Sequence, residues 1–227
     1  NGSDPAVIYY GERGITDGVE SITSSVQQVN IYLDNGTQAL AVDSTFADGS
    51  TSIYTGTGTD TITIGATVSG LHPAQLEDVA YVAGPLNIQG STTPSAKATV
   101  IVDGTGGDFS AASRVGVLNN NTITGLGMAG SIAISNIDTL EIDLGPYGNT
   151  FYIPSTVAGT NTSVYAGAGF NTVHLGKATT AGTAQLTGLS GSLSVYGQAK
   201  SGAVALAGNE LSFDDQSDSS NRTWSVS

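Results

Sequence analysis

The sequence predicts an all-β fold, a right-handed parallel β-solenoid (β-helix) made of two tandem units of about 110 residues each. Three observations support it: short runs of alternating apolar residues, glycine-rich corners between them, and an internal duplication. The 227 residues are predicted to form a single continuous repeat domain. Within it, residues 1–19 are an expected N-terminal cap, 20–130 the first unit and 131–227 the second. The alternative architecture is one β-sandwich in each unit, because sandwiches give a similar rhythm of short strands.

The apolar runs have the period and length of strands. Each run is short, alternates apolar with polar residues and is bounded by Gly, Asn, Asp or Ser, which is typical of a strand with one buried face. Helical spacing is nearly absent, and the one candidate helix is His72–Ala83, where Pro73 suits the first turn. The runs are Val29–Leu33, Ile62–Ile64, Leu86–Ile88, Val100–Val102, Ile132–Ile134, Leu140–Leu144, Val173–Leu175, Leu193–Val195 and Val204–Leu206.

The duplication appears when residues 30–65 are placed over residues 141–176 with a constant offset of 111. Twelve of the 36 aligned positions are identical, whereas this composition gives roughly three by chance. The likeness continues in "PLNIQG" (85–90) against "SLSVYG" (192–197), and in "VIVDG" (100–104) against "LSFDD" (211–215). The chain therefore contains two related units.

Glycine placement favours the solenoid over the sandwich. In "GTGTDTITIG" the glycines fall at a turn and the next residues alternate Thr with Ile. A chain that turns on glycine, forms one short strand and turns again winds into coils that pair in parallel. Threonine suits the outer face of stacked strands. Tyr54 and Tyr165 occupy the same coil position. We expect them to pack beside the glycine corner, with an exposed tyrosine ladder as the alternative.

Composition excludes several classes of partner. Nineteen Asp and Glu face only six Lys and Arg, a net charge of −13, so the chain cannot neutralise many phosphates and nucleic acid is not expected to bind. No apolar run approaches the roughly 18 residues that a membrane span needs, so membrane insertion is not expected. Cysteine is absent, and the fold must be held by its core and its backbone hydrogen bonds.

Three segments resemble the G-G-x-G-x-D-x-U-x nonapeptide of haemolysin-type (RTX-like) proteins. They are Gly56-Thr-Gly58-Thr-Asp60-Thr-Ile62, Gly104-Thr-Gly106-Gly-Asp108-Phe109 and Gly167-Ala-Gly169-Phe-Asn171-Thr-Val173. The wider phrase order is similar to adhesin-like tandem arrays of large secreted or surface proteins. The resemblance implies an extracellular or cell-surface, non-catalytic segment of a longer polypeptide. Its implied partners are further copies or neighbouring repeats of the longer chain, and glycans.

The resemblance also brings in calcium, although the motifs here depart from the family pattern. Each motif stands alone, the key Asp is Asn171 in the second unit and Asn149 in "GPYGNTF", and Lys200 occupies a decayed copy. Calcium needs six to eight oxygen ligands, so a single motif is not a site. We therefore interpret these Asp and Asn residues as backbone caps of glycine corners. No firm cofactor is predicted; if one Ca²⁺ site survives, Asp60 or Asp108 is the better candidate.

Catalytic patterns are weak, and no catalytic, cofactor-binding or metal-binding residue is predicted. Glu141 and Asp143 share one face of a predicted strand, which could suit acid–base chemistry, but we expect a solvated outer face. His72 lies before Pro73 in a loop, and His174 is expected on the outer face. The other acidic candidates are Asp138, Asp214, Asp215 and Asp218.

The function expected from the sequence is a non-catalytic extracellular structural or adhesion repeat module that assembles into fibres or a surface layer. Two alternatives stay open: a calcium-dependent or glycan-binding module, and a polysaccharide-active β-helix enzyme.

Overall fold

A computed structural model describes residues 27–65, 78–105, 113–146, 148–177, 184–198, 200 and 208–218. Within these ranges the chain forms fifteen strands and two short 3₁₀ helices, η1 (Val79–Tyr81) and η2 (Leu186–Gly188), and no α-helix. The predicted all-β class is confirmed. The expected N-terminal cap at residues 1–19 lies outside the described residues, as does the run Val204–Leu206.

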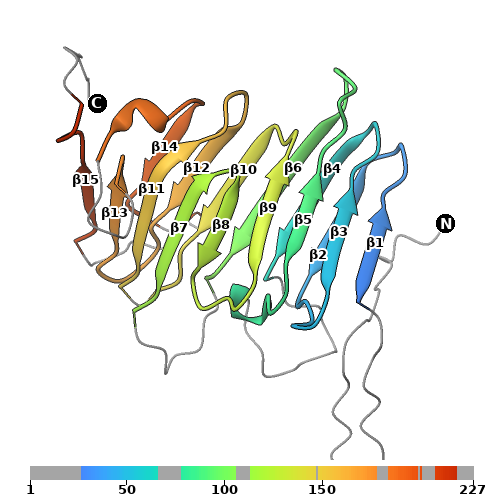
Figure 1. Cartoon of the computed structure of the whole chain (residues 1–227), viewed down its shortest axis with the longest axis horizontal. Helices are drawn as coiled ribbons and strands as arrows, with labels where there is room; N and C mark the ends of the chain where they lie inside the picture. The colour runs from blue at the N-terminus through green and yellow to red at the C-terminus, as the bar shows by residue number, and fades with distance from the viewer. Residues whose placement is uncertain are drawn as a thin grey trace, which may run out of the picture.

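The strands form two sheets that lie face to face and extend along the length of the molecule (Figure 1). Sheet A has nine strands in the order β1-β3-β5-β9-β8-β7-β11-β13-β15, and sheet B has six in the order β14-β12-β10-β6-β4-β2. The bounds in sheet A are β1 Gln28–Tyr32, β3 Ser50–Tyr54, β5 Leu86–Gln89, β7 Val115–Asn120, β8 Thr122–Gly125, β9 Ser131–Ser135, β11 Thr150–Thr156, β13 Thr172–Leu175 and β15 Glu210–Phe213. Those in sheet B are β2 Gln38–Val42, β4 Thr59–Ile64, β6 Lys97–Asp103, β10 Thr139–Asp143, β12 Asn161–Tyr165 and β14 Leu193–Tyr196.

Strands that follow one another in the chain mostly change sheets. Over β1 to β6 and over β9 to β15 the chain alternates between sheets A and B. Within these stretches strands pair in parallel with the strand two places earlier, as β3 does with β1 and β4 with β2. The exception is β11, which pairs in parallel with β7 and not with β9. Parallel strands need a connection that carries the chain back to the starting end of its neighbour, and here the strand of the opposite sheet supplies it.

One hairpin interrupts the parallel order. Strand β8 pairs antiparallel with both β7 and β9, so these three strands form a meander within sheet A. Asn120, at φ 54°, begins the reversal between β7 and β8, and Asn tolerates this left-handed conformation better than most residues. Gly125 and Gly127, at φ 79° and 87°, flank the second reversal. The expectation of parallel coiling throughout is therefore wrong for β8.

Both sheets continue across the predicted unit boundary between residues 130 and 131. Strand β9 pairs with β5 in sheet A, and β10 pairs with β6 in sheet B, so neither unit forms a separate pair of sheets. The aligned strands of the two units lie in opposite sheets: β1, for example, is in sheet A and its counterpart β10 in sheet B. The chain changes sheets seven times between β1 and β10, an odd number, so the second unit starts on the other sheet.

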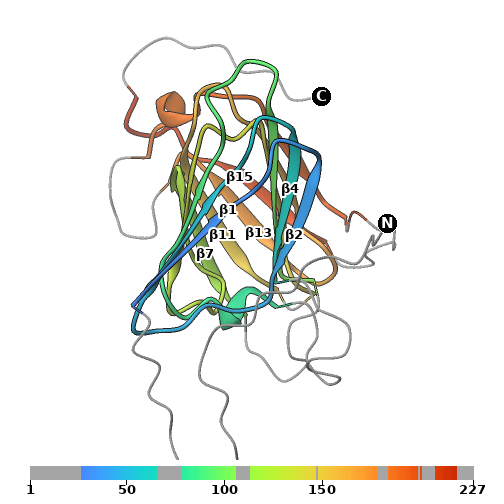
Figure 2. The same ribbon diagram turned by 90° about the vertical axis from the view of Figure 1, so that its right-hand side faces the viewer.

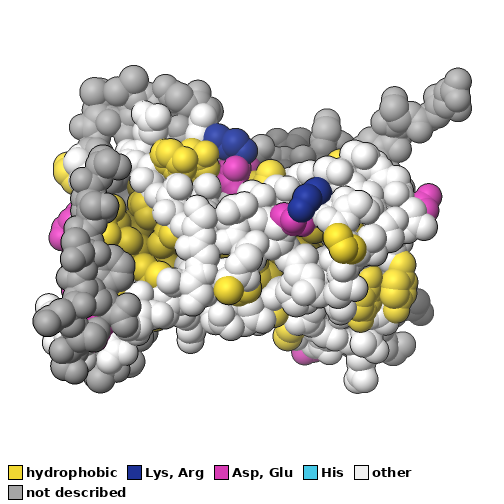
Figure 3. Space-filling model, turned by 90° about the horizontal axis from the view of Figure 1, so that it is seen from above, with side chains coloured by type: hydrophobic (Ala, Val, Ile, Leu, Met, Phe, Trp, Pro, Cys, Tyr) yellow, Lys and Arg dark blue, Asp and Glu magenta, His cyan; other side chains and the backbone are white. Residues whose placement is uncertain are grey.

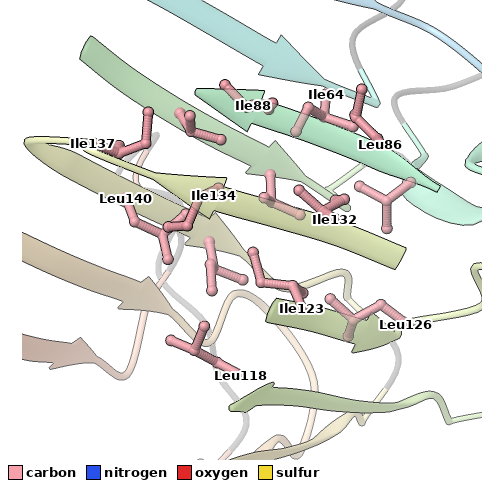
Figure 4. Close-up of a cluster of buried hydrophobic side chains, with 14 of the residues drawn as sticks. Ile64, Leu86, Ile88, Leu118, Ile123, Leu126, Ile132, Ile134, Ile137 and Leu140 are labelled. Atoms are coloured by element: carbon pink, nitrogen blue, oxygen red, sulfur yellow. The ribbon is translucent and has the colours of Figure 1, made fainter. Parts of the chain in front are cut away.

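The core lies between the two sheets and is shared by both units. Viewed along the long axis in Figure 2, the sheets appear as two walls around this interior. Ile53 of sheet A, Ile62 of sheet B and Phe151 of the second unit are all fully buried. Figure 4 shows Leu118, Ile123 and Ile132 of the meander within the same cluster as Ile64 and Leu86.

The helix predicted over His72–Ala83 is reduced to η1 in its described part, and residues 72–77 lie outside the described residues. Asp78 caps η1 by accepting the Ala80 N–H at 2.9 Å. The segment then becomes extended, because Val82 is fully buried and bridges Thr45 in parallel. Asp78 also accepts two hydrogen bonds from the Arg114 guanidinium, at 2.5 and 2.8 Å, which ties the start of the meander to η1.

No helix in the described ranges has the length and apolar character needed to cross a bilayer.

A matched pair of phenylalanines tests the position of the core. Phe151 is fully buried, whereas Phe170 is 73% exposed. Phe151→Ala should lower the free energy of unfolding by about 3–5 kcal/mol, because it leaves a cavity between the sheets. Phe170→Ala should change it by less than about 0.5 kcal/mol. Urea denaturation followed by circular dichroism measures both, and equal losses would contradict the assigned core.

Candidate functional site

The Asp of the first glycine-corner motif serves the backbone. Asp60 is fully buried, and its two carboxylate oxygens accept the N–H groups of Gln38 and Gly56, each at 3.1 Å. Gln38 belongs to the preceding coil, so the carboxylate links two neighbouring corners. This is the capping role that the sequence suggested. The second calcium candidate, Asp108, lies outside the described residues.

Asparagine performs the same role in the second unit. The N–H of Arg114 donates to Asn149 Oδ1 at 3.2 Å, that of Asn149 to Asn171 Oδ1 at 2.7 Å, and that of Asn171 to Asn209 Oδ1 at 2.9 Å. Each amide therefore caps the coil before it. Asn171 Nδ2 also donates to the carbonyl of Ala168 in its own turn at 2.9 Å, which an Asp could not do.

Metal ligands are not gathered at these corners. Within the described ranges, no group of three or more His, Cys, Asp or Glu side chains is placed to hold a metal ion. Calcium binding stays a prediction.

The outer faces of the two sheets carry equivalent positions with different chemistry. On sheet A, the first unit presents two rows of side chains across β1, β3 and β5. One row is Asn30, Ser52 and Asn87, and the other is Tyr32, Tyr54 and Gln89. On sheet B, the second unit presents the two aligned rows across β10, β12 and β14. One row is Glu141, Ser163 and Ser194, and the other is Asp143, Tyr165 and Tyr196. We call the first set the neutral face and the second the acidic face. The surface seen in Figure 3 carries few charged side chains.

The carboxylates of the acidic face are buried, so the expected solvated surface is wrong. Glu141 and Asp143 are only 8% and 6% exposed, although their side chains point away from the core. Lys200, which follows β14, forms an ion pair with Glu141. Tyr165 lies beside Asp143 in register and stacks on Tyr196, with ring centroids 4.6 Å apart. These neighbours come from strands and segments distant in sequence.

Asp143 is the strongly perturbed titratable group of this face. Burial, followed by the negative charges of Glu141 and Asp103, raises the pKa of Asp143 to about 7. Its Oδ1 is buried without a hydrogen-bond partner. The hydrogen bond to Glu141 raises the pKa of Lys200 as well. The acidic face therefore holds a proton on Asp143 near neutral pH.

The neutral face contains a shallow groove of about 240 Å³. Tyr54 lines the groove and stacks on Tyr32, with centroids 4.7 Å apart, and Tyr32 is 73% exposed. The recurring tyrosine thus forms short stacks on both outer faces, as the ladder alternative anticipated. Sequence reasoning did not identify the groove; aligning Gln89 with Tyr196 and Asn87 with Ser194 would have shown where the two faces diverge. The lining residues are Ser52, Ile53, Tyr54, Asn87, Ile88, Gln89, Asn121, Ala133, Ile134 and Ser135.

The remaining acidic candidates have structural partners. Burial would raise the pKa of Asp138, but hydrogen bonds from Lys97 and from the Ala98 N–H outweigh it, and the pKa is lowered. Asp215 accepts the Leu186 N–H at 3.0 Å, and the Asp218 N–H donates to the Asp215 carbonyl at 3.3 Å.

His174 lies on the outer face of sheet A, as expected. It stacks on Tyr152 at 4.8 Å and places Nδ1 3.3 Å from Asp214 Oδ2. Ser212 Oγ donates to Asp214 Oδ2 at 3.3 Å, so this serine bonds the carboxylate and not the imidazole, unlike the nucleophile of a catalytic triad. His72 lies outside the described residues.

Comparisons with family models, with curated proteins and with solved structures found no match to this chain.

Asp143→Asn tests the buried proton. Because the pKa is about 7 in the folded state and near 3.8 in the unfolded chain, folding keeps a proton that the unfolded chain loses. Stability of the wild type therefore falls as pH rises from about 4 to about 7. The variant lacks this loss, so it should be more stable than the wild type at pH 8, by on the order of 2 kcal/mol, and similar at pH 4.

Urea titrations at pH 4, 5.5, 7 and 8 measure the difference. The control is Asp48→Asn, which removes an exposed carboxylate in the turn before β3. A variant that is less stable than the wild type at pH 8 would show that the folded state requires the ionised carboxylate.

Proposed function

We propose that the chain is a non-catalytic extracellular structural or adhesion module, a right-handed parallel β-solenoid whose copies stack end to end into fibres or a surface layer. The alternation of strands between the two sheets and their parallel pairing support the solenoid. The similarity to adhesin-like arrays supports the extracellular setting. The acidic face is a structural cluster in this proposal, because Lys200 occupies Glu141 and Asp143 is sequestered from solvent.

The observation that carries the proposal is an uncovered end of the core. Leu211 and Phe213 of β15 are in register with Val173 and Leu175, which are 1% and 5% exposed, yet they are themselves 41% and 47% exposed. They occupy core-facing positions for which the described residues provide no following coil. The partly buried members of the core cluster fall mainly at the two ends: Val29, Leu33, Leu40, Leu189, Leu193 and Val195.

The two ends also carry strand edges that no other described strand pairs with. Strands β1 and β15 are the edges of sheet A, and β2 and β14 those of sheet B. An edge strand presents free N–H and C=O groups that can pair with another chain. A second copy placed head to tail would set its β1 against β15, which extends sheet A and covers the exposed core.

The duplication supplies the register of this contact. Strand β15 aligns with β6 and β1 with β10, and within the chain β6 pairs with β10 so that Val100 lies opposite Leu140 and Val102 opposite Ile142. Transferred to two copies, Leu211 lies opposite Val29 and Phe213 opposite Ile31. All four are apolar, so the contact repeats one that the chain already makes internally.

Net charge sets the conditions for stacking. Each copy carries −13, so copies repel one another at low ionic strength, and salt screens that repulsion. Self-association should therefore increase with protein concentration and with NaCl.

Light scattering after size exclusion measures self-association against a monomer mass of 22.8 kDa. Leu211→Asp and Phe213→Asp should keep the protein monomeric, because a charge would enter the apolar contact. The matched control, Phe170→Asp, changes an exposed residue in the corner before β13 and should leave assembly intact. A wild type that stays monomeric at every concentration and salt level would overturn the proposal.

The absence of cysteine allows the register to be tested separately. Neighbouring strands are about 4.8 Å apart, within the range of about 4.4–6.8 Å that a disulfide spans between Cα atoms. Val29→Cys and Leu211→Cys proteins, mixed and oxidised, should form a mixed dimer. Val29→Cys mixed with Val115→Cys should not, because Val115 lies in the middle of sheet A. Equal yields in the two mixtures would contradict the assigned register.

A further inference from the structure

The groove on the neutral face is lined by polar side chains, and most of them have no hydrogen-bond partner among the described residues. Asn87 and Gln89 are exposed in β5, and Ser52 and Ser135 flank them in β3 and β9. None of these four side chains hydrogen-bonds another described residue. By contrast, the fifth polar residue, Asn121, donates to the Ile134 carbonyl at 3.1 Å and is held in place.

An aromatic ring borders this row of amides and hydroxyls. Tyr54 precedes Gln89 and Ser135 in the same register row, which runs across three neighbouring strands. Tyr32 covers one face of the Tyr54 ring at an interplanar angle of 10° and fixes its orientation. A ring beside two free amides and two hydroxyls combines an apolar contact with directional hydrogen bonds, which is how small polar ligands are oriented.

Charge is absent from the groove. No Asp, Glu, Lys, Arg or His is among its lining residues. The aligned positions of the acidic face carry Glu141 where the neutral face has Asn30, and Asp143 where it has Tyr32. A ligand of this groove is therefore selected by hydroxyl and amide complementarity, and an anion would find no cation to pair with.

We propose that the groove binds a neutral oligosaccharide that lies across β3, β5 and β9. The C–H face of one sugar ring packs beside Tyr54, and sugar hydroxyls bond the side chains of Asn87, Gln89 and Ser135. Because neighbouring strands are about 4.8 Å apart, the side chains form an evenly spaced row that suits a linear chain of similar units. This deepens the adhesion part of the proposed function by naming its ligand class, and it does not depend on end-to-end stacking.

Titration of ¹⁵N-labelled protein with neutral hexasaccharides measures binding; the probes are cello-, manno- and N-acetylchitohexaose, with hexagalacturonate as the charged comparison. At least one neutral probe should shift the side-chain amide signals of Asn87 and Gln89, and hexagalacturonate should not. Asn87→Ala with Gln89→Ala should weaken binding about tenfold or more, since each lost hydrogen bond is worth about 1 kcal/mol.

The matched control changes the equivalent positions of the acidic face, Ser194→Ala with Tyr196→Ala. It should leave affinity for the neutral probe unchanged. Absence of binding by all neutral probes, binding of hexagalacturonate alone, or equal losses in the two double variants would overturn the proposal. Titrations run on the monomeric Leu211→Asp protein separate this outcome from a failure of end-to-end stacking, which light scattering reports independently.

Discussion

Parallel pairing between successive coils is the constraint on which the structure depends. Each strand must return to the same end of the molecule as the strand it pairs with, so the chain crosses to the opposite sheet and turns a tight corner each time. Corners bring backbone N–H groups into the interior, and Asp60, Asn149 and Asn171 accept them. The Asp or Asn of these glycine corners therefore has a backbone hydrogen-bonding role.

The same constraint exposes the ends. A coil is covered on one side by the coil before it and on the other by the coil after it, so the first and last coils keep apolar surface that internal coils bury. Leu211 and Phe213 are exposed for this reason, although their neighbours Val173 and Leu175 are buried. The proposed contact with another copy uses this surface and requires no residue specialised for it.

The aligned positions of the two predicted units lie on different outer faces and carry different side chains. Because an odd number of sheet changes places the second unit on the opposite sheet, equivalent rows do not merge into one continuous surface. One set keeps Asn30, Asn87 and Gln89, and remains neutral. The other has Glu141 and Asp143, whose mutual repulsion and burial raise the pKa of Asp143. The chain can thus carry two separate chemistries on one repeated framework.

The sequence by itself determined the all-β class, the positions of eight of the fifteen strands and the capping role of Asp60, because these depend on local alternation, glycine corners and short-range backbone geometry. It could not show the antiparallel strand β8, since pairing partners far apart in sequence decide strand direction. Nor could it show that Glu141 and Asp143 are buried, because the groups beside them, Lys200 and Tyr165, arrive from later coils. Only the tertiary structure placed Tyr54, Gln89 and Ser135 in one row, since register across three strands is set by the packing of the whole stack.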